Sequence, residues 1–101
     1  MEFASKLVSI KRFNDTLATF FFAKPEGFNF KAGQFALIAF DKEFKDGHPF
    51  TISSTPEDEL IGITVRKLGF FTQKLHEAEI GQDMFFEQRL DCLGLMTQMM
   101  K

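Results

Sequence analysis

Residues 48–54, His-Pro-Phe-Thr-Ile-Ser-Ser, combine an imidazole, a phenyl ring and several hydroxyl groups in one short run. In an extended strand, alternate side chains share a face, which places His48 and Phe50 on one side and Thr51 on the other. A ring beside a hydroxyl and a titratable imidazole could hold a flat heterocycle with a polar edge, by stacking and hydrogen bonding. Taken alone, the pattern is more typical of a core phenylalanine flanked by edge hydroxyls.

A second run, residues 66–72, reads Arg-Lys-Leu-Gly-Phe-Phe-Thr, where a predicted strand ends and a helix begins. A helix start presents N–H groups without intrahelical partners and suits a phosphate. Gly69 would let the backbone approach closely, and Arg66 could pair with the phosphate. The alternative is that Thr72 is a cap or first-turn residue and Arg66 a solvated strand end. Together, a ring-stacking strand and a phosphate-binding turn one strand later are what a flavin dinucleotide requires.

The elements that must position these residues are short and rich in β-formers, with Gly, Pro, Asn and Asp between them. Alternating or continuous apolar patterns predict strands over residues 3–13, 16–23, 34–40, 49–53, 60–66 and 83–88. A helix is predicted over 71–79, because Phe71, Leu75 and Ala78 fall at i, i+4 and i+7, with Gly81 as its stop. We therefore predict an all-β fold, a barrel or a sandwich of six strands, with one short helix after the fifth strand.

The composition of the chain limits the classes of function that it can have. The chain has 101 residues and a net charge of −2, which suits one globular domain and argues against a nucleic-acid partner. Cys92 is the only cysteine, so an intrachain disulfide is excluded and a reducing, cytoplasmic setting is expected. No apolar run approaches the roughly 20 residues of a membrane helix. The fifteen phenylalanines, without Tyr or Trp, could fill the core or line a ligand surface.

The order of these motifs resembles a known family. The run PEGFNFKAGQFALIAF and then HPFTISSTPEDELIGITVRKLGFFTQKL resemble the flavin-binding barrel of the ferredoxin–NADP reductase superfamily. The chain looks most similar to the branch of ferric reductases and NADPH oxidases, whose flavin strand also begins His-Pro-Phe-Thr. The likeness covers residues 3–88 and implies a six-stranded antiparallel Greek-key barrel, with one short helix after the fifth strand. It also implies FAD as the cofactor. Gly33 and Gln34 match the family's Gly-Gln before a core strand, which is more a fold signature than a ligand contact.

The resemblance also implies roles for the residues of the first motif. His48 stands where most relatives place an Arg that meets the FAD phosphates. Phe50 replaces the Tyr that stacks on the isoalloxazine ring. Thr51 supplies the hydroxyl next to flavin N5 and is the candidate catalytic residue.

In the second motif, the resemblance places the strand segment beside the ribityl and phosphate groups. Its residues are Val65, Arg66 and Lys67. Gly69 and Thr72 match the turn and helix start that hold the pyrophosphate. These five residues, with the three above, are the predicted cofactor-binding set.

Two departures from the family bear on function. The last strand usually leads into a Gly-Pro-Tyr/Phe-Gly turn, whereas residues 86–88 here run directly into Arg-Leu-Asp. We divide the chain into a barrel domain, residues 1–88, and a tail, residues 89–101, and find no nicotinamide-binding domain. We therefore expect an FAD-binding module of an oxidoreductase, receiving electrons from NAD(P)H held by another domain or protein. The alternative is a flavin-free barrel that binds proteins or assembles as a homodimer.

The remaining candidates have simpler interpretations. His76 lies beside Glu77 and Glu79, an arrangement more typical of a solvated helix face than of a metal site, and we predict no metal. The methionines at 96, 99 and 100 could form an adaptable contact surface or cover the open end of the barrel. Nothing marks Cys92 as activated, so a buried or inert thiol is expected.

Overall fold

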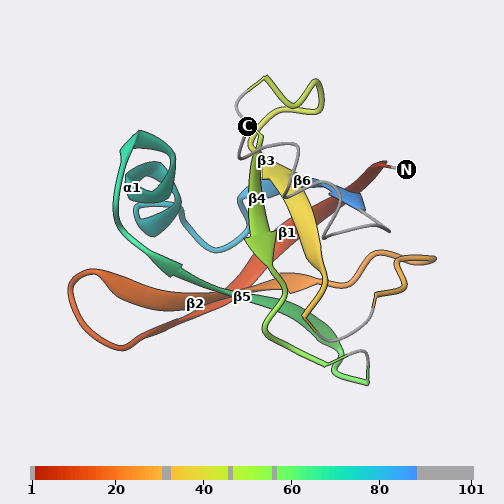
Figure 1. Ribbon diagram of the computed structural model, residues 1–101, viewed down its shortest axis with the longest axis horizontal. Helices are drawn as coiled ribbons and strands as arrows, with labels where there is room; N and C mark the ends of the chain where they lie inside the picture. Colours follow the sequence, from red (N-terminus) through yellow and green to blue (C-terminus); the bar gives the residue numbers. More distant parts are fainter. Residues whose placement is uncertain (1, 31–32, 46, 56, 89–101) are drawn as a thin grey trace.

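The computed structural model describes residues 2–30, 33–45, 47–55 and 57–88, and Figure 1 shows their arrangement. The predicted tail, with Cys92 and the methionines at 96–100, lies outside the described residues. The described chain forms strands and one helix in this order: β1 (Glu2–Arg12), β2 (Leu17–Ala23), β3 (Phe35–Ala39), β4 (His48–Thr51), β5 (Leu60–Arg66), α1 (Phe70–His76) and β6 (Asp83–Gln88). The all-β fold with one short helix after the fifth strand is confirmed.

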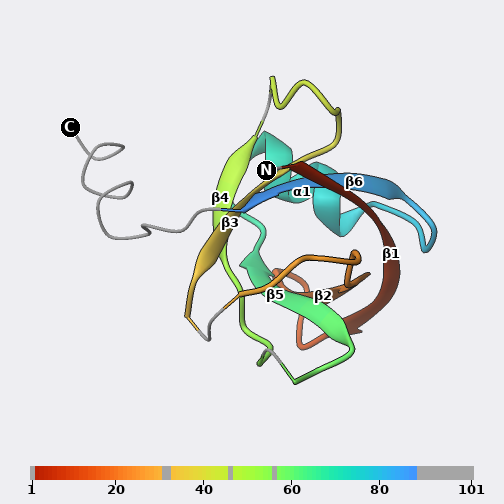
Figure 2. The ribbon, with the colours of Figure 1, turned by 90° about the vertical axis from the view of Figure 1, so that its right-hand side faces the viewer.

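The six strands form one antiparallel sheet in the order β4-β3-β6-β1-β2-β5. Residues 2–6 of β1 pair with β6, and from Leu7 onward the strand pairs with β2. The register shifts between Leu7 and Ser9, and such a bulge bends and twists a strand. β1 therefore curves around the barrel, as Figure 2 shows. The β1–β2 hairpin closes over Asn14, whose Oδ1 accepts the N–H groups of Thr16 and Leu17.

The barrel nearly closes where β4 and β5, the two ends of the sheet order, approach each other. Just beyond β4, Ile52 forms an isolated bridge with Ile63 of β5. The Ser53 N–H donates to the Gly62 carbonyl at 2.7 Å, and the Gly62 N–H donates to Ser54 Oγ at 2.9 Å. We call this contact the seam.

Phenylalanine rings fill much of the core. Phe20 and Phe22 of β2 and Phe86 of β6 are fully buried. The Phe22 and Phe86 rings meet edge to face with centroids 5.1 Å apart, and Phe28 lies 6.1 Å from Phe86. Edge-to-face contacts are a preferred geometry for such rings. Seven of the fifteen phenylalanines are buried in the barrel, so packing explains part of the unusual Phe content.

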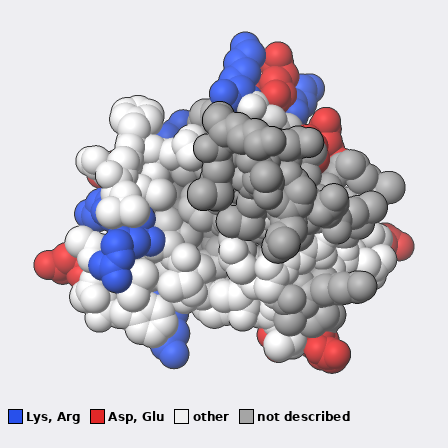
Figure 3. All heavy atoms as spheres, in the orientation of Figure 1, with Lys and Arg blue, Asp and Glu red and all other residues white. Residues whose placement is uncertain are grey.

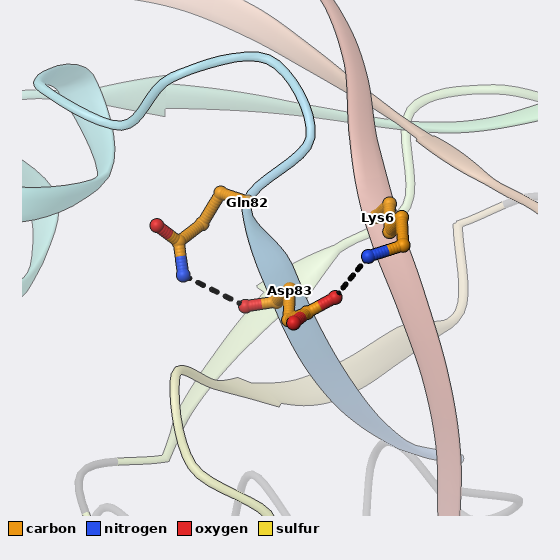
Figure 4. A network of polar contacts seen from close by, with 3 residues as sticks. All are labelled: Lys6, Gln82 and Asp83. Atoms are coloured by element: carbon orange, nitrogen blue, oxygen red, sulfur yellow. Dashed lines mark hydrogen bonds and ion pairs between the residues drawn. The ribbon is translucent and has the colours of Figure 1, made fainter.

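A polar contact on the outer surface accompanies the β1–β6 pairing. Lys6 and Asp83 are paired in the ladder, and Lys6 Nζ lies 2.6 Å from Asp83 Oδ1. Gln82 Nε2 donates to the Asp83 carbonyl at 3.1 Å, and Figure 4 shows the three residues together. Since both charged side chains are 65% exposed, this contact favours the register more than it stabilises the fold.

The helix is shorter than the predicted 71–79. It ends at His76 with Glu77 as its C-cap, and the Ala78 N–H donates to the Leu75 carbonyl at 3.1 Å, a tightened last turn. Gly81 is therefore not the helix stop. Its φ of +96° and its hydrogen bond to the Leu7 carbonyl, 2.8 Å, place it in the turn that leads into β6.

Two surface properties bear on partners. Within the described residues no helix is both long and apolar enough to cross a membrane. Basic and acidic side chains both appear on the face shown in Figure 3, and neither sign covers it.

Candidate functional site

The aromatic side of the candidate site lies on β4 and packs against the helix. His48 is exposed, Phe50 is half-buried and Thr51 is exposed. The His48 ring lies 4.5 Å from the Phe71 ring with an interplanar angle of 32°. The Phe50 ring is stacked on Phe71 at 5.7 Å and 28°. His48 and Phe50 thus share a face of β4, as the alternation predicted.

Phe71 is the centre of this aromatic cluster, which we define as Phe71, His48 and Phe50 and call the Phe71 cluster. The sequence predicted Phe71 only as part of the apolar stripe of the helix. It is 6% exposed, and its ring also lies 5.2 Å from Phe40. Lys74, one turn later on α1, holds its Nζ 4.3 Å from the Phe40 centroid, a cation–π geometry. The Phe71 side chain of α1 therefore packs against β4, next to the β5–α1 turn that is predicted to bind phosphate. An aromatic residue just before Thr72 was the available signal.

The turn between β5 and α1 is organised by the Thr72 hydroxyl. Thr72 Oγ1 accepts the Leu68 N–H at 2.8 Å and the Gly69 N–H at 2.9 Å, and donates to the Gly69 carbonyl at 3.1 Å. Thr72 is thus a capping residue, which was the alternative to a direct phosphate contact by its side chain. By the geometry of an α-helix, the first-turn N–H groups of Phe70, Phe71 and Thr72 have no acceptor within α1.

Gly69 leaves space in front of this turn. Its backbone is extended, with φ −156° and ψ −169°, so its conformation does not require glycine. A Cβ built there would meet no heavy atom within 4 Å. The backbone at Gly69 is therefore open to a group approaching from outside, as a phosphate contact needs.

The predicted residues at the end of β5 and just after it separate into two groups. The Val65 side chain is 2% exposed and belongs to the core, so a cofactor could meet only its backbone. Arg66 and Lys67 are exposed and are held beside the β1–β2 hairpin. The Arg66 guanidinium reaches Thr16 Oγ1 at 3.4 Å, and the Lys67 N–H donates to the Thr16 carbonyl at 2.6 Å.

The charge of this segment favours an anion. Between Glu59 and Glu77 the sequence contains no Asp or Glu but does contain Arg66, Lys67 and Lys74. A run of one sign around a turn with outward N–H groups attracts phosphate. Among the residues that the structure describes, no three His, Cys, Asp or Glu side chains are grouped as a metal site would require.

His76 is where the prediction from sequence was wrong. It was expected on a solvated helix face, yet it is 4% exposed. On a helical wheel it lies about 100° from Leu75, so a single apolar stripe would leave it outside. It is buried because the Phe20 ring, 5.1 Å away, and the end of β5 approach it from the barrel.

Comparison with known proteins decides the family. The family model for an FAD-binding domain matches residues 2–92. This chain belongs to that FAD-binding domain family. Its residues fit the cofactor, because an aromatic strand, an open backbone at Gly69 and an acid-free basic segment lie around one helix start. Phe50 and Thr51 would lie along the flavin ring, and His48, Arg66, Gly69 and the first turn of α1 at the phosphates.

Individual relatives agree with the family. Respiratory burst oxidase homolog protein D from Solanum tuberosum is 34% identical over 74 residues, 71% of this chain and 8% of the relative. Dual oxidase 2 from Homo sapiens is 35% identical over 57 residues, 55% of this chain and 4% of the relative. The matched segments thus span under a tenth of these curated relatives.

The fold also recurs in solved structures. A ferredoxin NADP+ reductase from Neisseria gonorrhoeae, crystallised with bound FAD and NADP, superposes with a TM-score of 0.77 at 18% identity. The superposition covers 87% of this chain and 37% of that one. The FAD-binding domain family, in the NADPH oxidase branch, therefore accounts for both the sequence and the barrel.

Proposed function

We propose that this FAD-binding domain holds the flavin across β4 and the β5–α1 turn and orients it for electron transfer. The electrons would come from NAD(P)H bound by another domain or protein and would leave to a separate acceptor. The observation that carries the proposal is the Phe71 cluster. In this cluster Phe50, proposed to stack on the ring, and His48, proposed to meet the phosphates, both pack against Phe71 of the helix whose first turn would bind the pyrophosphate.

Bound FAD would supply the redox chemistry, and the chain would supply orientation and electrostatics. The exposed part of the Phe50 ring would cover the isoalloxazine, since Phe71 already supports Phe50 from the helix. The Thr51 hydroxyl, exposed at the end of β4, would hydrogen-bond the polar edge of the ring. Arg66 and the first-turn amides would balance the pyrophosphate charge, each by a charge-assisted hydrogen bond.

Calorimetric titration of the chain with FAD, riboflavin and ADP tests the binding geometry. FAD should bind one to one and more tightly than either fragment, because it occupies both halves of the site. A chain that binds FAD no more tightly than ADP would contradict the ring site on β4. A chain that binds none of the three would instead support the flavin-free assembly module.

A further inference from the structure

His76 is a buried polar residue with no role in the proposed ligand contacts. Its Nε2 lies 3.0 Å from the Val65 carbonyl oxygen. Because a carbonyl can only accept, Nε2 carries the hydrogen and donates it. The bond joins the last residue of α1 to the strand residue just before Arg66. A buried polar side chain at this place fixes a geometry more specifically than an apolar one of similar size, because the hydrogen bond has a direction.

The backbone carbonyl of His76 is bound as well. The Arg12 guanidinium donates through Nη2 to the His76 carbonyl at 2.9 Å, which satisfies one of the carbonyls left free at a helix end. His76 therefore links α1 to β5 by its side chain and to β1 by its carbonyl.

These links matter because α1 cannot position itself. The helix has seven residues, a glycine at its N-cap and no acidic residue in its first turn. A helix this short is marginal without tertiary contacts. Its buried residues are Phe71, Leu75 and His76, and among these His76 alone makes a directed bond to β5.

We propose that His76 is a positioning residue for the phosphate side of the FAD site. β5 ends at Arg66, one residue after Val65, where His76 holds the strand, and the chain reaches α1 at Gly69, where Thr72 holds the turn. With both ends fixed, Arg66 and the first-turn amides face one anion at a constant spacing. The inference rests on the proposed function, since it concerns how that site is kept in register.

The test compares the affinities of FAD and riboflavin, which differ in the phosphate and adenosine parts. His76→Leu fills a similar volume without a donor, and His76→Gln keeps an N–H donor. We expect His76→Leu to weaken FAD at least tenfold and riboflavin less than twofold, and His76→Gln to recover most of the loss. Gln73→Leu, on the exposed side of α1, is the control and should change neither affinity.

Arg12→Ala extends the test to a variant whose altered side chain is exposed, in case His76→Leu does not fold. It removes the bond to the His76 carbonyl and should also lower FAD affinity relative to riboflavin, by severalfold. If neither variant changes the ratio of the two affinities while thermal stability falls, His76 is only structural and the inference is wrong.

Wild type and Arg66→Ala separate this outcome from a failure of the proposed function. Wild type should prefer FAD to riboflavin, and Arg66→Ala should reduce that preference. No preference in wild type would overturn the phosphate site and the role of His76 together. A wild-type preference that Arg66→Ala reduces and His76→Leu leaves intact would overturn the His76 role alone.

Discussion

Replacing Gly69 by alanine separates ligand contact from folding at the β5–α1 turn. Among the glycines that the structure describes, Gly69 combines an extended backbone with open space where a Cβ would stand. Alanine is less favourable than glycine at an N-cap, by about 0.5–1 kcal/mol. It also lowers the entropy of the unfolded chain, which stabilises by about 0.4–1 kcal/mol. The two effects nearly cancel, so the free energy of unfolding should change by less than about 0.5 kcal/mol.

The affinity for FAD should respond quite differently. A methyl group at Gly69 would occupy the space through which a phosphate approaches the first turn. Losing one charge-assisted hydrogen bond costs about 1.5–3 kcal/mol, which corresponds to roughly 10- to 150-fold in the dissociation constant. Riboflavin, which lacks the phosphates, should bind Gly69→Ala as it binds wild type.

Calorimetry with both ligands, and thermal unfolding without ligand, measure these quantities. Gln73→Ala, on an exposed position of α1, controls for a change in the helix itself. Unchanged FAD affinity in Gly69→Ala would refute the reasoning, because the open space would then not be used by the cofactor. Equal weakening of FAD and riboflavin would place Gly69 at the ring and not at the phosphates.

Other expectations concern the ring, the electron donor and the surface. Phe50→Ala should weaken the binding of riboflavin and of FAD alike, by about 1–3 kcal/mol, through lost apolar contact. The control Phe13→Ala, at a phenylalanine that is 53% exposed, should weaken the binding of neither ligand. A large loss of thermal stability with intact affinity would make Phe50 a core residue. Mixed anaerobically with FAD and NADPH, the chain should reduce flavin no faster than free FAD reacts, because residues 1–101 show no Gly-rich dinucleotide fingerprint. Rapid, saturable bleaching of the flavin absorbance would contradict this. Thr51→Val should leave FAD affinity within about tenfold and shift the flavin absorbance bands, and an unshifted spectrum would remove Thr51 from the ring edge. Lys6→Met should change the free energy of unfolding by less than about 1 kcal/mol in urea titration, and a larger loss would mean that the β1–β6 contact is a real source of stability.

The strands could be read from the sequence because each has a clear local signal. Residues 60–66 alternate, and the run from 35 to 40 is apolar, short and bounded by turn residues, so strands were predicted for both segments. The predicted and observed bounds agree exactly for β5 and β6 and within two residues for the other strands. The barrel topology followed from the family resemblance, since pairing β5 with β2 across the sequence leaves no local mark.

The end of α1 and the burial of His76 were harder to predict from the sequence. Periodicity extended α1 to residue 79, but the turn into β6, fixed by the Gly81 bond to Leu7, ends it earlier. The burial of His76 depends on Phe20, 56 positions away in sequence, and no window around residue 76 contains that information. Local pattern therefore predicted which elements exist, and tertiary contact decided where the helix ends and which of its faces is buried.

The candidate site divides in the same way. The residue types at 48–51 and 66–72 were enough to propose a ring site and a phosphate site, and the eight predicted residues remain predictions. Alternation along β5 already grouped Val65 with the apolar Ile61 and Ile63, but the sequence could not show that Thr72 Oγ1 is already engaged by the turn. Nor could it show that Phe71 connects the two sites, because stacking between a strand and a helix is a property of the assembled barrel.

The seam gives the barrel a defined weak point. Its hydrogen bonds are few, and the strands on either side carry the two halves of the proposed cofactor site. A dinucleotide that contacts β4 and the end of β5 would hold the two edges together, so local opening should become rarer as the cofactor binds. Amide exchange and proteolytic cleavage near Ser53 and Gly62 would then slow in proportion to cofactor occupancy. In a cell, the fraction of the barrel that holds flavin would thus influence its rate of proteolytic degradation, independently of the redox role of the flavin.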